Sequence, residues 1–216
     1  NKQILHAGDI LLCTIKRIRD IIIPNKGVIM NIFILDKHPV IAAQLQCDKH
    51  VVKMIVESAQ MLSTAHRMLD GHVEKRLSKS GKRMLNYWCH NIPEKEELLY
   101  KAVHHSHPCT LWTMESNANY EWHYKHFIAL CDEYQYRYGK VHSTQTKLQG
   151  ILQRPPSRIP WTNLYTKFKL AMQHEPQCMH PDDPVRSYRE YYQTKQDRFK
   201  MVWSKRNVPE WFKEVA

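Results

Sequence analysis

The 216-residue chain has only 6 Gly and 11 Pro, and it has no long apolar run. So little Gly and Pro excludes a collagen-like fibre or a low-complexity linker, while 43% hydrophobic and 25% charged residues indicate a folded domain. The apolar run at residues 21–23 ends at Pro24, far short of the roughly 20 residues that span a bilayer. We therefore expect a folded protein with no membrane-spanning segment.

Paired cysteines and acidic residues are scarce as well. The 6 Cys include no CxxC pair, which argues against a disulfide framework and favours reduced thiols in the cytoplasm. Lys and Arg number 32 against 21 Asp and Glu, so the net charge is +11 with the 14 His neutral. Such a surplus favours binding to polyanions such as nucleic acid, or to an anionic membrane surface.

Met is missing from residues 1–29 and first occurs at Met30. We therefore expect residues 1–29 to be an upstream extension, with the domain beginning near Met30; the alternative is an ordinary N-terminal hairpin or helix. Residues 30–216 contain no internal repeat and no low-complexity run. This predicts a single domain.

Apolar residues recur at helical spacing along this domain, which predicts a mainly α, single-domain helical bundle. Asp70-Gly71 and Gly139 are expected to end the two longest helices. The apolar run 31–35 predicts a short N-terminal strand or a buried extended entry, and residues 72–107 predict a loop-rich excursion with short helices. The predicted helices span residues 40–69, 109–138, 144–153, 161–173 and 184–203, the last within a basic, aromatic C-terminal arm at 184–216.

The first long helix is predicted to carry one polar face. At about 100° per residue, amine, imidazole, carboxylate and amide side chains fall near Lys53. They are Gln46, Lys49, His50, Glu57, Gln60, Thr64 and Arg67. Cations bind oxyanions and Glu can relay a proton, so this face predicts phosphate binding and proton transfer. The alternative is a solvated face in which Lys53 and Glu57 are an ordinary (i, i+4) pair; Asp48, off this face, would need a partner if buried.

The histidines cluster without the spacing of a zinc site. The clusters are His104, His105 and His107, then His123 and His126, then Cys178 with His180. None offers a second ligand pair at a diagnostic separation, so we expect neither a metal site nor a cofactor. Asn119, early in the second long helix, is expected either to pack or to face the first helix across a cleft.

The C-terminal arm interleaves cations with aromatic side chains. Tyr188, Tyr192, Phe199 and Trp203 recur at helical spacing and are expected in the core, the alternative being rings that stack on unpaired bases. The cations Arg198 and Arg206 are expected to contact nucleic-acid phosphates.

Residues on the two long helices resemble a family of small helical phage and bacterial proteins labelled pyrimidine-dimer DNA glycosylases. The resemblance covers about residues 30–140 and is carried by Asp48-Lys49, Lys53, Glu57, Gln60, Leu62, His107-Pro108, Trp112 and Ala129-Leu130-Cys131-Asp132-Glu133. The segments 187–192 and 208–212 look typical of phage versions of the family. A phage origin would place the protein in the cytoplasm of the host cell.

The resemblance implies excision of damaged pyrimidines from DNA, with associated strand cleavage. An enzyme amine attacks the sugar C1′, the base leaves, and the resulting Schiff base permits cleavage while the lesion is held out of the stack. In characterised members the amine is the chain's own N-terminus. Met30-Asn31 departs from that arrangement, so Lys49 or Lys53 is expected as the amine and Glu57 as the acid/base. The expected substrate contacts are His50, Gln60, Arg67, His107, Asn119, Arg198 and Arg206.

Two other functions remain open. A non-catalytic basic helical protein would bind nucleic acid, or a phage or host partner, through the same polar face and arm. An enzyme of group transfer to bases or nucleotides is a weaker hypothesis, because no Gly-rich phosphate loop is present. The catalytic hypothesis requires the polar row to line one concave wall opposite His107. That row is Lys49, His50, Lys53, Glu57 and Gln60.

Overall fold

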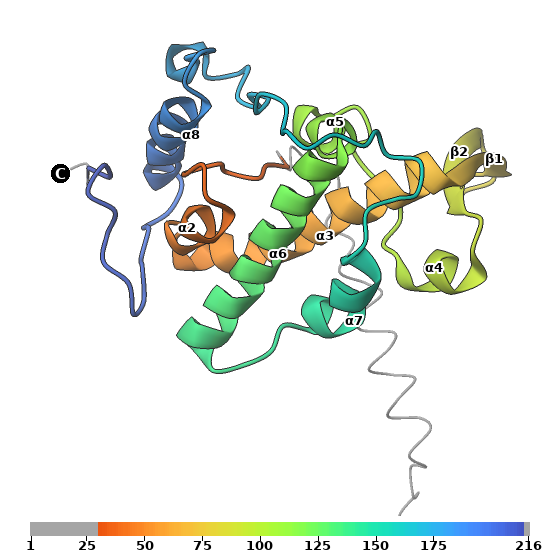
Figure 1. Cartoon of the computed structure of the whole chain (residues 1–216), viewed down its shortest axis with the longest axis horizontal. Coiled ribbons are helices and arrows are strands. Elements are labelled where there is room, and N and C mark those ends of the chain that lie inside the picture. The colour runs from red at the N-terminus through yellow and green to blue at the C-terminus, as the bar shows by residue number, and fades with distance from the viewer. Residues whose placement is uncertain (1–29, 214–216) are drawn as a thin grey trace, which may run out of the picture.

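Two crossing helices, α3 (Asp48–Asp70) and α6 (Asn117–Tyr138), organise the computed structural model, which describes residues 30–213 (Figure 1). α6 packs against α3 and α2 (Pro39–Gln44), and α5 (Pro108–Met114) and α7 (Ser143–Leu152) pack against α3. The mainly α prediction is confirmed for this part of the chain. Residues 1–29, the predicted extension, lie outside the described residues. Within residues 30–213, no helix has the length and apolar character needed to cross a membrane.

The first predicted long helix is broken at residues 45–47, between α2 and α3. The Cys47 amide donates to the Tyr192 hydroxyl at 2.9 Å, and the Asp48 amide donates to the Val202 carbonyl at 2.8 Å. These partners satisfy backbone groups that a continuous helix would have paired internally. The break is therefore stabilised by C-terminal residues that the local pattern does not reveal.

The second predicted long helix is also divided, between α5 and α6. Ser116 caps α6, because its hydroxyl accepts a hydrogen bond from the Asn119 amide at 3.0 Å. α6 ends at Gly139, whose φ of 67° is left-handed. The end at Gly139 is thus confirmed, and so is the short helix after it, α7.

An antiparallel hairpin, β1 (Gly71–Leu77) with β2 (Met84–His90), stands at the C-terminal end of α3, and α4 (Pro93–Leu98) follows it (Figure 1). The prediction of loop with short helices is wrong for the two strands, which lack a clean alternation of apolar and polar residues. The strand register pairs Gly71 with His90. The end of β2 therefore returns to the last turn of α3.

The C-terminal segment is less helical than predicted. Residues 161–173 contain no helix, and the chain then forms η1 (Pro176–Cys178), α8 (Pro184–Gln193), η2 (Thr194–Asp197) and an irregular stretch. Tyr188, Tyr192 and Trp203 are buried, as the core interpretation predicts. The Trp203 indole donates to the Leu45 carbonyl at 2.9 Å. The segment therefore packs on the body of the protein.

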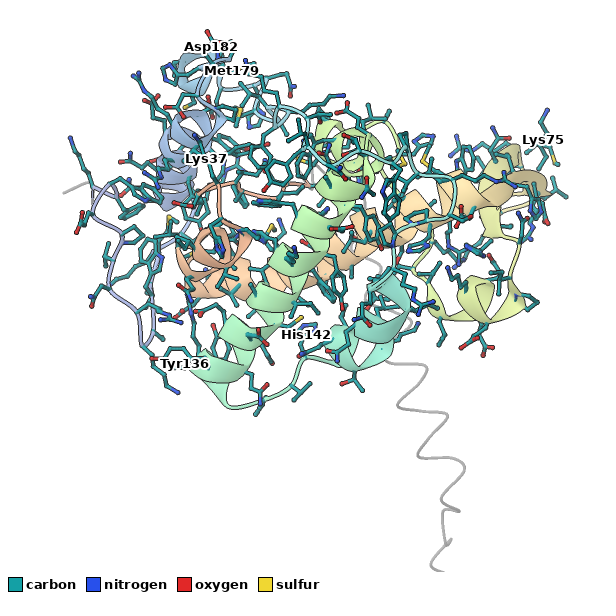
Figure 2. The ribbon with its side chains drawn as sticks, viewed as in Figure 1. Lys37, Lys75, Tyr136, His142, Met179 and Asp182 are labelled. Carbon is teal, nitrogen blue, oxygen red and sulfur yellow. The ribbon has the colours of Figure 1, made fainter. Side chains whose placement is uncertain are left out.

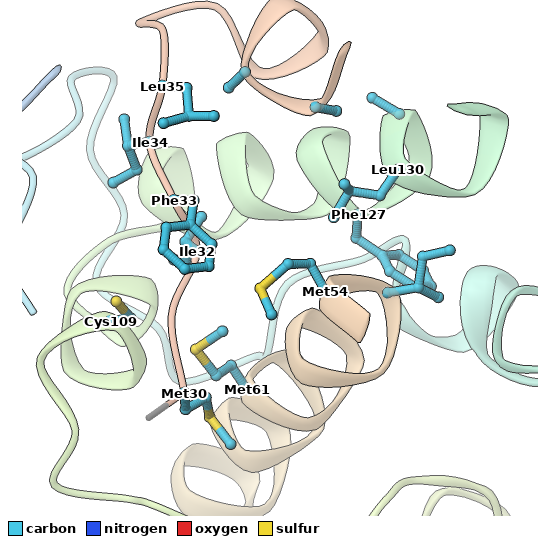
Figure 3. Close-up of a cluster of buried hydrophobic side chains, with 14 of the residues drawn as sticks. Met30, Ile32, Phe33, Ile34, Leu35, Met54, Met61, Cys109, Phe127 and Leu130 are labelled. Atoms are coloured by element: carbon cyan, nitrogen blue, oxygen red, sulfur yellow. The ribbon is translucent and has the colours of Figure 1, made fainter. Parts of the chain in front are cut away.

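Residues 30–35 run through the core without a partner strand among the described residues (Figure 3). The predicted strand is wrong, and the buried extended entry is what forms. Phe33 has a φ of 53°, a left-handed conformation that costs a non-Gly residue about 1–3 kcal/mol. The Asn31 side chain supports this bend, because its Oδ1 accepts from the Phe33 amide at 2.9 Å.

Candidate functional site

The centre of the candidate site is Glu57, on the face of α3 that meets residues 30–35. Its Oε2 accepts a hydrogen bond from the main-chain N–H of Asn31 at 3.1 Å, and its Oε1 lies 3.0 Å from Nζ of Lys53. Burial raises the pKa of the Glu57 carboxyl, and Lys53 and the Asn31 amide partly oppose that rise. Glu57 therefore takes up a proton more readily than an exposed Glu does, as an acid/base residue must.

Lys53 joins this buried carboxylate to solvent. The helix places it one turn before Glu57, and its side chain is 45% exposed whereas that of Glu57 is 5% exposed. The predicted (i, i+4) ion pair is thus confirmed. Its amine is the group in this pair that a substrate can approach.

His50 lies one turn before Lys53 on the same face of α3 and is buried. Its ring stacks on Phe33 at a centroid distance of 4.8 Å, and its Nδ1 lies 2.7 Å from the Tyr192 hydroxyl. Burial first, then Lys53 and Lys195, lowers the pKa of His50 to about 3. The imidazole is therefore neutral at physiological pH, and it contributes no positive charge to a phosphate site.

Lys195, in η2, is a second amine near this site that sequence reasoning did not single out. It is buried, its Nζ lies 3.4 Å from the centroid of the Tyr191 ring, and it makes no ion pair within residues 30–213. Burial and then Arg198 lower the pKa of Lys195 to about 8, with a contribution from Lys53. Nothing in the sequence distinguishes it from the other cations of the arm, because its burial depends on how the arm folds back.

Arg67, predicted as a substrate contact from its place on the polar face, is committed to contacts within the fold. It is buried, and its guanidinium donates to the carbonyls of Tyr100, Trp88, Glu96 and Leu99 and pairs with the Glu96 carboxylate. Every N–H donor of the side chain is used within the protein. Arg67 therefore ties α3 to the hairpin and to α4.

Asn119 and Arg206 are likewise committed to the fold. The Asn119 amide donates to the Trp112 carbonyl and to the Thr166 hydroxyl, both at 2.7 Å, and its oxygen accepts from the Thr166 amide at 2.9 Å. The Arg206 guanidinium pairs with Glu133 and stacks 4.6 Å from the centroid of the Tyr136 ring. Both side chains anchor irregular segments to α6, which accounts for them without a substrate.

Lys49, the other predicted amine, and the remaining predicted substrate contacts lie in different environments. Lys49 is exposed with its amine 4.5 Å from the Phe199 ring centroid, Gln60 is half-buried, and Arg198 is exposed. His107 caps α5 by accepting from the Cys109 amide at 3.2 Å, and burial followed by His104 lowers the pKa of His107 to about 4. The concave wall opposite His107 stays a prediction.

The histidine clusters of the sequence lie in different surroundings among the described residues. His123 and His126 are buried and contact Thr113 and Gln46 at 2.7 and 3.3 Å. A different group, His66, Asp70 and His90, brings three potential ligand atoms within 4.8 Å of one another. Sequence reasoning missed it, because His90 comes from the hairpin that was not predicted.

The cysteines of the described residues are all buried free thiols. Asp48, which was expected to need a partner, accepts from Arg137 at 3.0 Å and from the Ser204 hydroxyl at 2.6 Å.

Comparison of the chain with protein-family models, with curated proteins and with solved structures found no match.

Proposed function

We propose that the protein acts on DNA as a base-excision glycosylase with associated lyase activity on damaged pyrimidines. The observation that carries the proposal is the buried Glu57 carboxylate in contact with the Lys53 amine and the Asn31 main-chain nitrogen. A net charge of +11 supports a polyanionic substrate. The resemblance to the dimer-glycosylase family supports the reaction class.

The chemistry assigns one role to each partner. Glu57 takes a proton from the Lys53 ammonium, and the neutral amine attacks C1′ of the damaged nucleotide. Glu57 returns the proton to the departing base. A proton of the substituted Lys53 nitrogen then passes to O4′ as the C1′–O4′ bond breaks, which leaves an iminium ion joining Lys53 to the opened sugar. The Glu57 carboxylate then removes a C2′ proton, and elimination breaks the bond to the 3′ oxygen.

Asn31 bears on which amine attacks. The resemblance implies an N-terminal amine, but in the full chain the Asn31 nitrogen is an amide and is not a nucleophile. In a chain that began at Asn31, that nitrogen would be an α-amine, and the corresponding atom lies 3.1 Å from Glu57. A chain released at Asn31 from a cleavable fusion therefore has to be assayed beside the full chain.

The test is turnover on defined duplexes. The full chain and the Asn31-start chain are incubated with ultraviolet-irradiated and with abasic duplex DNA, and released bases and nicked strands are counted. We expect Glu57→Gln to slow cleavage by about 10²- to 10⁴-fold, the usual contribution of a general acid/base. The matched control, Glu94→Gln on the exposed start of α4, should leave the rate unchanged. No cleavage by either chain, or full activity of Glu57→Gln, would refute the proposal.

A non-catalytic nucleic-acid-binding protein is the alternative, and the hairpin favours it. Lys75, Lys79, Lys82 and Arg83 are exposed and make no ion pair among the described residues. Figure 2 shows Lys75 on the hairpin, at the far end of the molecule from α8. Such cations bind phosphates whether or not chemistry follows. The same cleavage assay separates the two functions, because a protein that only binds leaves the damaged DNA uncut.

A further inference from the structure

We propose that His66, Asp70 and His90 bind one divalent transition-metal ion of the Zn²⁺ class. Their candidate ligand atoms all lie within 4.8 Å of one another. Two ligands on one tetrahedral zinc ion are about 3.3 Å apart, given metal–ligand bonds of about 2 Å, so modest side-chain rotation closes the site. The donor set, two imidazoles and one carboxylate, suits Zn²⁺ and excludes Mg²⁺ or Ca²⁺ as preferred ions.

The fold explains why these three residues meet. His66 and Asp70 are one turn apart at the end of α3, so they share a face. His90 ends β2 and is paired in the strand register with Gly71, the residue that follows Asp70. A Cβ at Gly71 would lie 2.1 Å from the Cys89 carbonyl oxygen, which shows how closely the hairpin approaches the helix end.

Each histidine has one buried ring nitrogen without a hydrogen bond of normal geometry among the described residues, Nδ1 of His66 and Nε2 of His90. The Arg154 main chain also interacts with the His66 ring. The Tyr120 hydroxyl donates to the Leu152 carbonyl at 2.9 Å, so it accepts from Nε2–H of His66, also at 2.9 Å. That contact leaves a lone pair on His66 Nδ1, and it matches the outer-shell support that metal-bound histidines commonly have.

His90 has to change its tautomer to bind the metal. The Ile92 amide donates to His90 Nδ1 at 3.0 Å, which leaves the proton of the neutral ring on Nε2. When the proton moves to Nδ1, the Nε2 lone pair becomes a ligand and the hydrogen bond from the Ile92 amide is given up.

Asp70 completes the set of ligands. Its carboxylate accepts from the Ser157 amide, the Ser157 hydroxyl and the Arg158 amide at 2.8, 2.9 and 3.0 Å. A carboxylate has about four acceptor positions, so one remains for the metal. The bound ion would link α3, the hairpin and the 157–158 loop, and a water molecule would fill a fourth position.

The test is zinc binding by the full chain after treatment with a chelator. Zn²⁺ is titrated in competition with a chromophoric chelator, and thermal melting is recorded with and without Zn²⁺. We expect one ion per chain and a raised melting temperature in the unmodified protein. Asp70→Asn and His90→Gln should each weaken binding by more than about 100-fold, since loss of an outer partner alone costs about 10- to 100-fold.

The matched control is His104→Gln with His105→Gln, because both residues are exposed and outside the group. The control should bind zinc as the unmodified chain does. Circular dichroism checks that each variant is folded. If neither ligand variant folds, Co²⁺ bound to the unmodified chain decides, because a four-coordinate site gives intense visible absorption. Absence of saturable one-to-one binding, binding unchanged in a folded ligand variant, or a weak six-coordinate Co²⁺ spectrum would overturn the proposal.

Discussion

Arg67 and Glu57 show how differently two polar residues of one helix face are used. Both are nearly excluded from solvent. All three guanidinium nitrogens of Arg67 donate to carbonyls or to a carboxylate, whereas Glu57 contacts one amine and one main-chain amide. The (i, i+4) spacing was enough to predict the Lys53–Glu57 pair. It was not enough to separate binding residues from anchors, because the partners of Arg67 come from the unpredicted hairpin and α4.

Arg67→Ala tests the anchoring role. The change leaves the Glu96 carboxylate and several carbonyls without their donor, so we expect the free energy of unfolding to fall by about 3–5 kcal/mol. Urea denaturation measures the change. Arg83→Ala, an exposed arginine of the hairpin tip, is the matched control and should leave stability unaltered. Equal stability of the two variants would show that the buried network contributes nothing.

At the scale of elements, local signals predicted helix ends better than helix breaks. Gly71 and Gly139 mark the ends of α3 and α6. Gly139 has the left-handed φ that favours glycine, whereas Gly71 is extended and is required by the close approach of the Cys89 carbonyl. The break before α3 depends on Tyr192, which is 145 residues away from Cys47, and no local pattern contains that information. The break before α6 has a local signal, the Ser116 cap, but the prediction of one helix over 109–138 did not use it.

Gly71→Ala tests the junction between α3 and the hairpin. The added Cβ would lie 2.1 Å from the Cys89 carbonyl oxygen and 2.4 Å from that of Arg67, and backbone cannot easily yield. We expect the free energy of unfolding to fall by about 1–3 kcal/mol. Gly150→Ala, in α7, meets nothing within 4 Å and should stabilise by about 0.5 kcal/mol. A neutral Gly71→Ala in chemical denaturation would contradict this packing.

At the scale of the whole molecule, buried histidines set the response to acid. Burial lowers the pKa of His50 and of His126 to about 3, and it lowers the pKa of His123 well below its ordinary value. The unfolded chain binds protons at these groups near pH 6.5, so it holds more protons than the folded chain below that pH. Stability is therefore complete above about pH 6.5 and is lost as pH falls toward 3. The raised pKa of Glu57 has the opposite effect, because it makes stability fall as pH rises above the ordinary pKa of Glu. Glu57 is one group, however, and the buried histidines are several.

Urea denaturation at pH 7, 6 and 5 measures this response. Each buried histidine should remove about 2 kcal/mol between pH 7 and pH 5, from about 1.4 kcal/mol per pH unit below 6.5. His126→Gln should reduce the slope by one histidine's share, because Gln has no proton to gain. A free energy of unfolding that is constant from pH 7 to pH 5 would contradict neutral burial of these rings.

The fold class was predictable from the sequence, whereas the candidate site was predictable only in part. Helical periodicity and the lack of long apolar runs indicated a mainly α fold with no membrane-spanning helix, and the described residues agree. Two contributors to the site were not predicted. Asn31 meets Glu57 in an entry segment that also bends at Phe33, and Lys195 is buried where the C-terminal segment folds back. Both depend on tertiary packing.

The proposed reaction requires an amine beside Glu57 to form a covalent bond with DNA. Borohydride reduction during incubation with abasic duplex, followed by peptide mapping, detects that bond. In the full chain we predict a stable protein–DNA adduct on Lys53, retained in Glu94→Gln and strongly reduced in Glu57→Gln. In the chain that begins at Asn31, two amines lie beside Glu57, the new N-terminus and Lys53. We predict an adduct on one of these two amines. An adduct confined to lysines of the hairpin tip, or no adduct with either chain, would refute covalent catalysis beside Glu57.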